Sequence, residues 1–142
     1  MTRVRELLAD KPDRIIQIGP QVPVLEAIRL MALEGIGALL VVEHGRLLGI
    51  VSERDYARKV ILHGKASANT PVREIMSSPV VSVTPEASVA ECMSLMTERR
   101  FRHLPVLDGE TLVGVVSIGD LVKSVIDEQR REIDQLQRFI SS

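Results

Sequence analysis

The sequence predicts an α+β protein in which two β-α-β-β-α repeats pack sheet to sheet and an extended helix follows the second repeat. Residues 24–61 align with residues 89–126 without a gap, and internal repetition of this kind organises a whole fold. Each copy contains one helical apolar pattern and two short apolar runs. Because one copy alone can scarcely bury its sheet, we expect the two copies to cover each other.

The repeat also aligns the polar residues that follow the second apolar run of each copy. Gly49, Ser52 and Asp55 correspond to Gly114, Ser117 and Asp120. A shorter segment, residues 4–8, matches residues 72–76 at a slightly larger offset. We therefore predict a first repeat at residues 1–63, a linker at 64–71, a second repeat at 72–127 and a helical extension at 128–142.

Each copy is expected to begin with a short extended segment, at residues 14–18 and 80–83, and to continue as a helix. Apolar residues at the spacing of one buried helix face are Val24, Ala27, Ile28 and Met31 in the first copy, and Val89, Cys92, Met93 and Met96 in the second. Gly35 is expected to end the first helix, and Ser88 with Glu91 to form a capping box at the start of the second.

Two strands joined by a tight turn are expected next, at residues 38–42 and 47–51, and at residues 103–107 and 111–116. A second helix closes each copy. In the second copy it continues as an apolar row at steps of three and four residues: Val122, Ile126, Gln129, Ile133, Leu136 and Ile140. This extension either packs on its own domain or meets a second copy of the chain.

The Ser-x-x-Asp sequence at the start of each closing helix has two interpretations. A serine at the N-cap and an acidic residue three positions later stabilise a helix start and need no ligand. The same groups suit a nucleotide, because a carboxylate accepts hydrogen bonds from two neighbouring ribose hydroxyls and a helix N-terminus stabilises phosphate. One aspartate can serve both purposes.

Paired units that carry a glycine, two apolar residues and Ser-x-x-Asp after the third strand resemble the CBS domain, named after cystathionine β-synthase. GIVSERD and GVVSIGD carry this motif, and RHLPVLD and VVSVTPEASV also fit the family. The resemblance covers nearly the whole chain. It implies a stand-alone pair of bacterial type, a Bateman module, with its repeats around a pseudo-twofold axis. Such modules typically bind AMP, ADP, ATP, S-adenosylmethionine or NAD(H), and regulate a partner without catalysis of their own.

The resemblance further implies two ligand clefts that each draw on both repeats. The first cleft combines Ile50, Ser52, Arg54 and Asp55 with Phe101, Arg102, His103 and the backbone near Val80. The second cleft combines Val115, Ser117 and Asp120 with Ile36, Gly37, Ala38 and the backbone near Ile16. In these clefts Ile50 and Val115 supply flat packing for a base.

Positive charge distinguishes the two predicted clefts. Arg54, Arg102 and His103 suit phosphate oxygens, and the second cleft has no such residues. We therefore expect the first cleft to bind a phosphorylated nucleotide, with AMP favoured. The second is expected to take a neutral adenosyl group or the other half of a dinucleotide, or to stay empty. The alternatives are a solvated helix end for the arginines at residues 99–102 and an ordinary half-buried position for His103.

Composition excludes several function classes. The net charge is −1, no apolar run is long enough to span a membrane, and aromatic residues are limited to one Tyr and two Phe. Neither nucleic acid nor a membrane is therefore an expected partner. The chain has a single cysteine, Cys92, and no metal-ligand spacing or Walker loop, so we expect no metal and no enzyme activity.

We therefore predict a cytoplasmic, homodimeric sensor of adenine nucleotides that regulates an unidentified protein partner. The alternative from another class is an interaction or scaffold protein whose clefts are vestigial.

Overall fold

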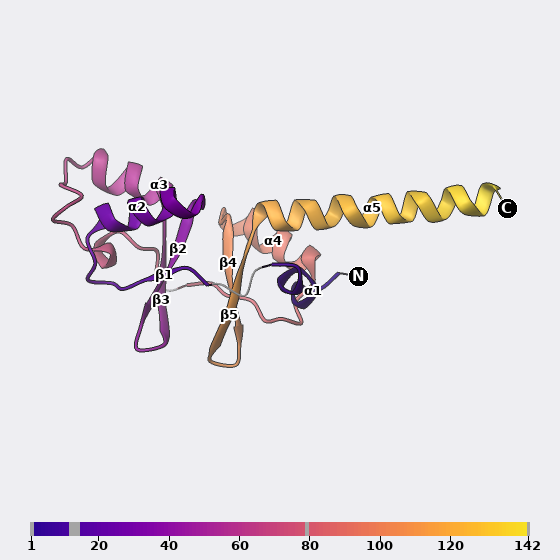
Figure 1. The fold of residues 1–142 in the computed structure, drawn as a ribbon, viewed down its shortest axis with the longest axis horizontal. Coiled ribbons are helices and arrows are strands. Elements are labelled where there is room, and N and C mark those ends of the chain that lie inside the picture. Colours follow the sequence, from indigo (N-terminus) through magenta and orange to yellow (C-terminus); the bar gives the residue numbers. More distant parts are fainter. Residues whose placement is uncertain (1, 12–14, 79, 142) are drawn as a thin grey trace. The chain divides into compact units, whose positions relative to one another are not determined.

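The computed structural model describes residues 2–11, 15–78 and 80–141, and it confirms the predicted α+β class and the extended C-terminal helix (Figure 1). The elements are α1 (Val4–Ala9), β1 (Gln17–Ile18), α2 (Val24–Glu34), β2 (Ala38–Glu43), β3 (Arg46–Ser52), α3 (Glu53–Tyr56), α4 (Val89–Arg99), β4 (His103–Asp108), β5 (Thr111–Ser117) and α5 (Ile118–Ser141). A π-helical turn (Ala57–Ile61) continues α3, and a 3₁₀ turn (Val72–Glu74) precedes α4.

The chain divides into two compact units, each of which combines the body of one repeat with a short segment from the start of the other. The first-repeat unit is Ile15–Val81, and the second-repeat unit is Met1–Arg14 together with Ser82–Ser142. Segment 4–8, from the start of the first repeat, belongs to the second-repeat unit. Segment 72–76, which matches it in sequence and comes from the start of the second repeat, belongs to the first-repeat unit. The hydrogen bonds show this exchange: Val4 N donates to Ala87 O at 2.9 Å, and Val72 N donates to Val22 O at 2.9 Å.

Two glycines allow the exchanged segments to approach the sheets closely. A Cβ atom on Gly49 in β3 would lie 2.7 Å from Met76 Sδ and 2.8 Å from the Ser77 carbonyl oxygen. A Cβ atom on Gly114 in β5 would lie 2.7 Å from a terminal methyl carbon of Leu8. Gly49 and Gly114 are equivalent positions of the two repeats. Each leaves room for a residue of an exchanged segment, Met76 at Gly49 and the equivalent Leu8 at Gly114.

The first-repeat unit contains a three-stranded sheet of order β1-β2-β3, with β1 parallel and β3 antiparallel to β2. α2 packs on this sheet through Val24, Ala27 and Met31, as its apolar spacing predicts. Gly35 ends α2 in the left-handed conformation, with φ of 67°. The core of this unit is Val24, Ala27, Met31, Leu39, Val41, Val51, Val60, Val72 and Ile75.

The second-repeat unit contains the β4-β5 hairpin, and α4 begins with Ser88 accepting a hydrogen bond from the Glu91 backbone at 3.1 Å. The predicted strand over residues 80–83 is wrong in extent, since only Val83 pairs, in a parallel bridge with Val106. Val83 N donates to Pro105 O at 3.0 Å, and Leu107 N donates to Val83 O at 2.9 Å. The next ladder bond toward Val81 needs an N–H at residue 105, which proline lacks.

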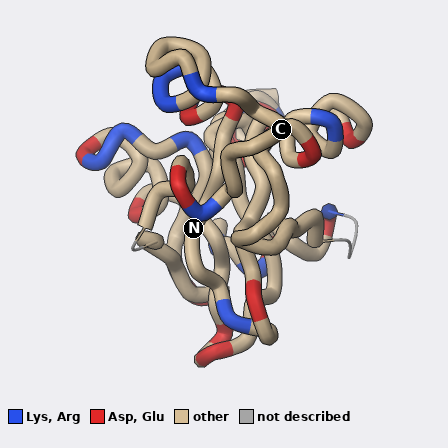
Figure 2. Tube along the Cα trace, turned by 90° about the vertical axis from the view of Figure 1, so that its left-hand side faces the viewer, with Lys and Arg blue, Asp and Glu red and all other residues tan. Residues whose placement is uncertain are grey.

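α5 is one long helix that continues past α4 (Figure 1). Its first turns are anchored by the buried residues Leu121 and Ser124, whereas residues 129–141 are all exposed. Figure 2 shows that residues of both charges are distributed along the trace of the chain, consistent with the net charge of −1. No helix among the described residues is long and apolar enough to cross a membrane.

Candidate functional site

The first Ser-x-x-Asp motif forms a capping box at the junction of β3 and α3. Ser52 Oγ accepts a hydrogen bond from Asp55 N at 3.2 Å. Asp55 Oδ2 accepts from Ser52 N at 2.9 Å and from Ser52 Oγ at 3.0 Å. The capping interpretation is therefore confirmed for this motif. Lys59 lies one turn along, with its Nζ atom 3.3 Å from Asp55 Oδ1, and it also donates to the Ile75 carbonyl at 2.9 Å.

The second motif makes the same backbone contacts where β5 meets α5. Asp120 N donates to Ser117 Oγ at 3.1 Å, and Ser117 N donates to Asp120 Oδ2 at 2.8 Å. Lys11, from the segment after α1, donates to Asp120 Oδ2 at 2.8 Å and to the Val115 carbonyl at 2.8 Å. Each aspartate is thus paired with a lysine that also holds a backbone carbonyl.

The environment of Asp120 favours the carboxylate over the acid. Partial burial acts to raise the pKa of Asp120, but hydrogen bonds from Lys11 and Ser117, together with the charge of Lys11, hold that pKa below its usual value. Asp120 is therefore ionised at neutral pH and able to accept hydrogen bonds. The stability that this pairing contributes is present above the unfolded-state pKa and is lost as the pH falls through the folded-state pKa.

In each unit, strand pairing places the start of one hairpin strand, β2 or β4, beside the Ser-x-x-Asp motif of the same repeat. Ala38 pairs with Ser52 in the first-repeat unit, and His103 pairs with Ser117 in the second-repeat unit. Backbone hydrogen bonds extend both contacts by one residue. Glu53 N donates to Gly37 O at 3.1 Å, and Ile118 N donates to Arg102 O at 2.9 Å.

Ile16 also lies at the motif edge of the first-repeat unit. It immediately precedes β1, which runs parallel to β2 with Gln17 opposite Leu40, so Ile16 is at the same end of the sheet as Ala38. Among the other predicted site residues, Ile36, Ile50, Phe101 and Val115 are half-buried and Arg54 is exposed. Val80 is half-buried and follows Ser77, whose backbone pairs with Ile50. The sharing of each cleft between the two repeats stays a prediction.

Two lysines at these motifs were not predicted from the sequence. Lys59 is four residues after Asp55, which is the spacing of a helical ion pair, so this contact had a local signal. Lys11 had none, because it reaches Asp120 only through the exchange that packs α1 against β5. No group of three or more potential metal-ligating side chains was found among the described residues.

His103 is half-buried near three charged side chains. Burial lowers its pKa below the usual value, the positive charges of Lys11 and Arg102 act in the same direction, and the negative charge of Asp120 opposes them. The imidazole is therefore neutral at pH 7, so it offers a hydrogen-bond donor and an acceptor and no full positive charge.

We expect the free energy of unfolding to fall as the pH is lowered below about 6.5, the usual value for an unfolded histidine. Below this pH the unfolded chain binds a proton at His103, whereas the imidazole in the folded chain stays neutral. The free energy of unfolding therefore continues to fall until the pH reaches the lowered folded-state pKa of His103. Urea unfolding between pH 7.5 and 5.5 measures it. His103→Gln should flatten the dependence, whereas the control His63→Gln, at an exposed turn position, should leave it unchanged. If the free energy of unfolding changed equally with pH in both variants, the assignment of this pH dependence to His103 would be contradicted.

Comparison with known proteins adds independent evidence. A family model described as CBS domain matches residues 4–62 and 72–127. The mitochondrial CBS domain-containing protein CBSX3 of Arabidopsis thaliana is 43% identical over 122 residues, which cover 82% of this chain and 59% of that relative. This chain thus spans less than two thirds of that relative's length.

Two solved structures share the fold. A protein with CBS domains from Burkholderia ambifaria matches with a TM-score of 0.87 and 54% identity, over 90% of this chain and 96% of that one. The CBS domain pair of protein MJ0100, solved in complex with 5′-methylthioadenosine and S-adenosyl-L-methionine, matches with a TM-score of 0.78 and 25% identity, over 90% of this chain and 98% of that one.

Proposed function

Because this chain belongs to the CBS domain family, we propose that it is a regulatory module that binds adenosine-containing ligands at its two Ser-x-x-Asp motifs. The observation that carries the proposal is the pair of aspartates at equivalent strand-to-helix junctions, each beside the start of a neighbouring strand. Both ligands of the MJ0100 pair contain adenosine, which supports this ligand class for the present chain. A ribose diol suits a carboxylate in this position.

We propose the predicted site residues in a new grouping, in which each site is built from the residues of one repeat. The first-repeat site consists of Ile16, Ile36, Gly37, Ala38, Ile50, Ser52, Arg54, Asp55 and the backbone near Val80. The second-repeat site consists of Phe101, Arg102, His103, Val115, Ser117 and Asp120. Strand pairing supports this grouping, because it places Ala38 beside Ser52 and His103 beside Ser117.

The new grouping also changes which site receives phosphate. Arg102 and His103 lie beside Ser117, so the phosphorylated ligand, with AMP favoured, is proposed at the second-repeat site. The corresponding edge of the first-repeat site is Gly37 and Ala38, which carry no charge and suit a neutral adenosyl group. The proposed role is binding and regulation of a protein partner in the cytoplasm, without catalysis.

Absorbance and thermal unfolding test this function. With one Tyr and no Trp the protein absorbs weakly at 280 nm, so a co-purified adenine nucleotide is visible as excess absorbance at 260 nm. Ligand at about 100 times its dissociation constant stabilises the folded state by about 2.7 kcal/mol. We expect a raised melting temperature with at least one of AMP, ADP, ATP, S-adenosylmethionine or NAD(H). The scaffold alternative predicts no shift with any of them.

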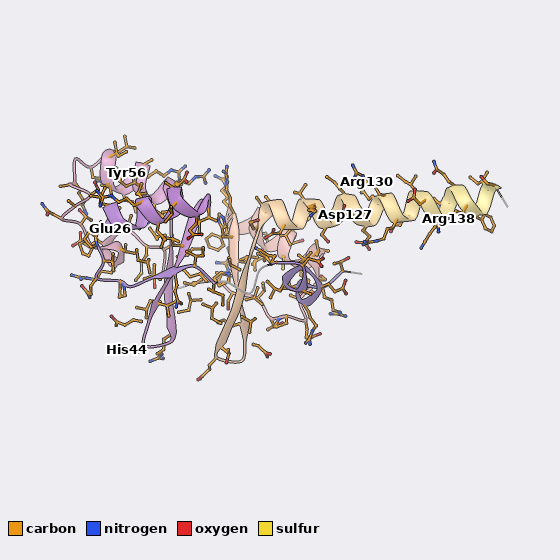
Figure 3. All side chains as sticks on the ribbon, viewed as in Figure 1. Glu26, His44, Tyr56, Asp127, Arg130 and Arg138 are labelled. Carbon is orange, nitrogen blue, oxygen red and sulfur yellow. The ribbon has the colours of Figure 1, made fainter. Side chains whose placement is uncertain are left out.

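We also propose that the exposed end of α5 joins two copies of the chain. Ile133, Leu136 and Ile140 are 53%, 62% and 80% exposed and follow one face of the helix at the spacing of a coiled-coil seam. Charged residues such as Arg130 and Arg138 project from the same part of α5 (Figure 3). An identical helix offers the matching apolar row, which makes a second copy the expected partner.

A single charge on this row should separate the copies. Ile133→Glu is expected to give a particle of one chain, 15.7 kDa, where the unchanged protein gives twice that mass. The matched control Gln135→Glu adds the same charge on the opposite side of α5 and should leave the dimer intact. Sedimentation equilibrium measures both. A wild-type monomer, or a dimer that persists in Ile133→Glu, would contradict the seam.

A further inference from the structure

We propose that Lys11 determines ligand specificity at the second-repeat site. Its ammonium group occupies the oxygen of Asp120 that a ribose needs, and after displacement it favours ligands that carry phosphate. This inference rests on the proposed function, since it concerns which adenosine-containing ligand that site accepts.

The backbone around Lys11 fixes where its side chain reaches. Leu8 packs over Gly114 on β5, and Lys11 N donates to Leu8 O at 3.2 Å, so the end of α1 is held against the strand that leads to the motif. From there the Nζ atom reaches the Val115 carbonyl and Asp120 Oδ2, both at 2.8 Å. The side chains of Lys11 and Asp120 are only 33% and 27% exposed, unlike those of an ordinary surface pair.

Hydrogen-bonding capacity makes Lys11 a competitor of the ribose. A carboxylate oxygen offers about two acceptor positions. At Asp120 Oδ2 the Ser117 N–H takes one at 2.8 Å, and Lys11 takes the other. A vicinal diol that bridges the two carboxylate oxygens therefore has to displace the ammonium group from Oδ2.

The first-repeat site has a different arrangement. There, among the described residues, Oδ2 of Asp55 accepts from the backbone N and the Oγ of Ser52, and the ammonium group of Lys59 lies 3.3 Å from the other oxygen, Oδ1. Lys59 belongs to the same helical segment as Asp55, and its counterpart in the second repeat is the buried Ser124. The lysines at the two sites thus come from unrelated parts of the chain.

The charge of Lys11 also selects among ligands. After displacement the ammonium group stays close, because α1 anchors its backbone. A phosphate on the ligand restores an ion pair with it, a neutral adenosine does not, and a sulfonium is repelled. Lys11 therefore disfavours adenosine relative to AMP at this site.

Calorimetric titration of adenosine and AMP tests this in an Asp55→Asn background, which removes the diol acceptor of the first-repeat site. Compared with the Asp55→Asn protein that retains Lys11, the protein that also carries Lys11→Met should bind adenosine about fivefold more tightly. This is the factor expected when a partly exposed ion pair no longer has to be broken. Its preference for AMP over adenosine should fall by at least the same factor. Lys11→Arg should keep the preference, and the control Lys65→Met, at an exposed position outside both motifs, should change neither affinity.

The outcomes separate this inference from the function on which it rests. If adenosine and AMP bind but Lys11→Met leaves both affinities unchanged or weakens adenosine, Lys11 does not compete and the inference is overturned. If the Asp55→Asn protein and the wild type bind neither ligand, the proposed function is overturned together with it.

Discussion

Replacement of Gly49 by alanine is expected to lower the free energy of unfolding by about 2–3 kcal/mol, in the range for overpacking and backbone displacement. The new Cβ would lie 2.8 Å from the Ser77 carbonyl oxygen, which belongs to the backbone and pairs with Ile50, so it cannot move without breaking that pairing. The substitution therefore forces the exchanged segment 72–76 away from β3.

Gly114→Ala is the matched variant in the other unit. Its new Cβ would meet the terminal methyl groups of Leu8, at 2.7 and 3.3 Å, and a side-chain end yields more readily than a backbone carbonyl. We expect a cost of about 1 kcal/mol. Urea unfolding of the two variants measures the difference, and equal losses, or a larger loss for Gly114→Ala, would contradict the packing described for Gly49.

The double variant Asp55→Asn/Asp120→Asn is expected to weaken the binding of adenosine-containing ligands strongly at both sites. A hydrogen bond to a charged group contributes about 1.5–3 kcal/mol, so each site should weaken by about 10- to 100-fold. Asparagine keeps the size of the side chain and retains one acceptor oxygen for the helix cap, so we expect the fold to persist.

The control for this variant is Asp108→Asn/Asp134→Asn, which makes the same change in net charge at two exposed positions. It should bind like the wild type in titrations with AMP. Comparable weakening in both double variants would show that net charge is the cause. Unchanged affinity in Asp55→Asn/Asp120→Asn would show that these aspartates do not bind the ligand.

Features set by local spacing could be predicted from the sequence. The stripe of Val24, Ala27 and Met31, the helix end at Gly35 and both hairpins depend on neighbouring residues and appear as expected. The loss of a strand before Val83 depends on Pro105, whose missing N–H was visible in the sequence but matters only once the two segments are known to pair.

Features that need long-range packing could not be predicted. The segments 4–8 and 72–76 match in sequence, but nothing in either segment specifies which repeat it packs against. The position of Lys11 follows from that exchange, and so does the cation at Asp120. The Ser-x-x-Asp motif itself was predictable, because its hydrogen bonds join residues three positions apart.

The central claim is that the two Ser-x-x-Asp motifs bind ribose in adenosine-containing ligands. Calorimetric titration of the wild type with AMP, adenosine and the free base adenine tests it most directly. We predict saturable binding of AMP and adenosine and at least tenfold weaker binding of adenine, which lacks the diol that a charged acceptor holds. Absence of saturable heat with AMP and adenosine, or equal affinity for adenine, would contradict the claim.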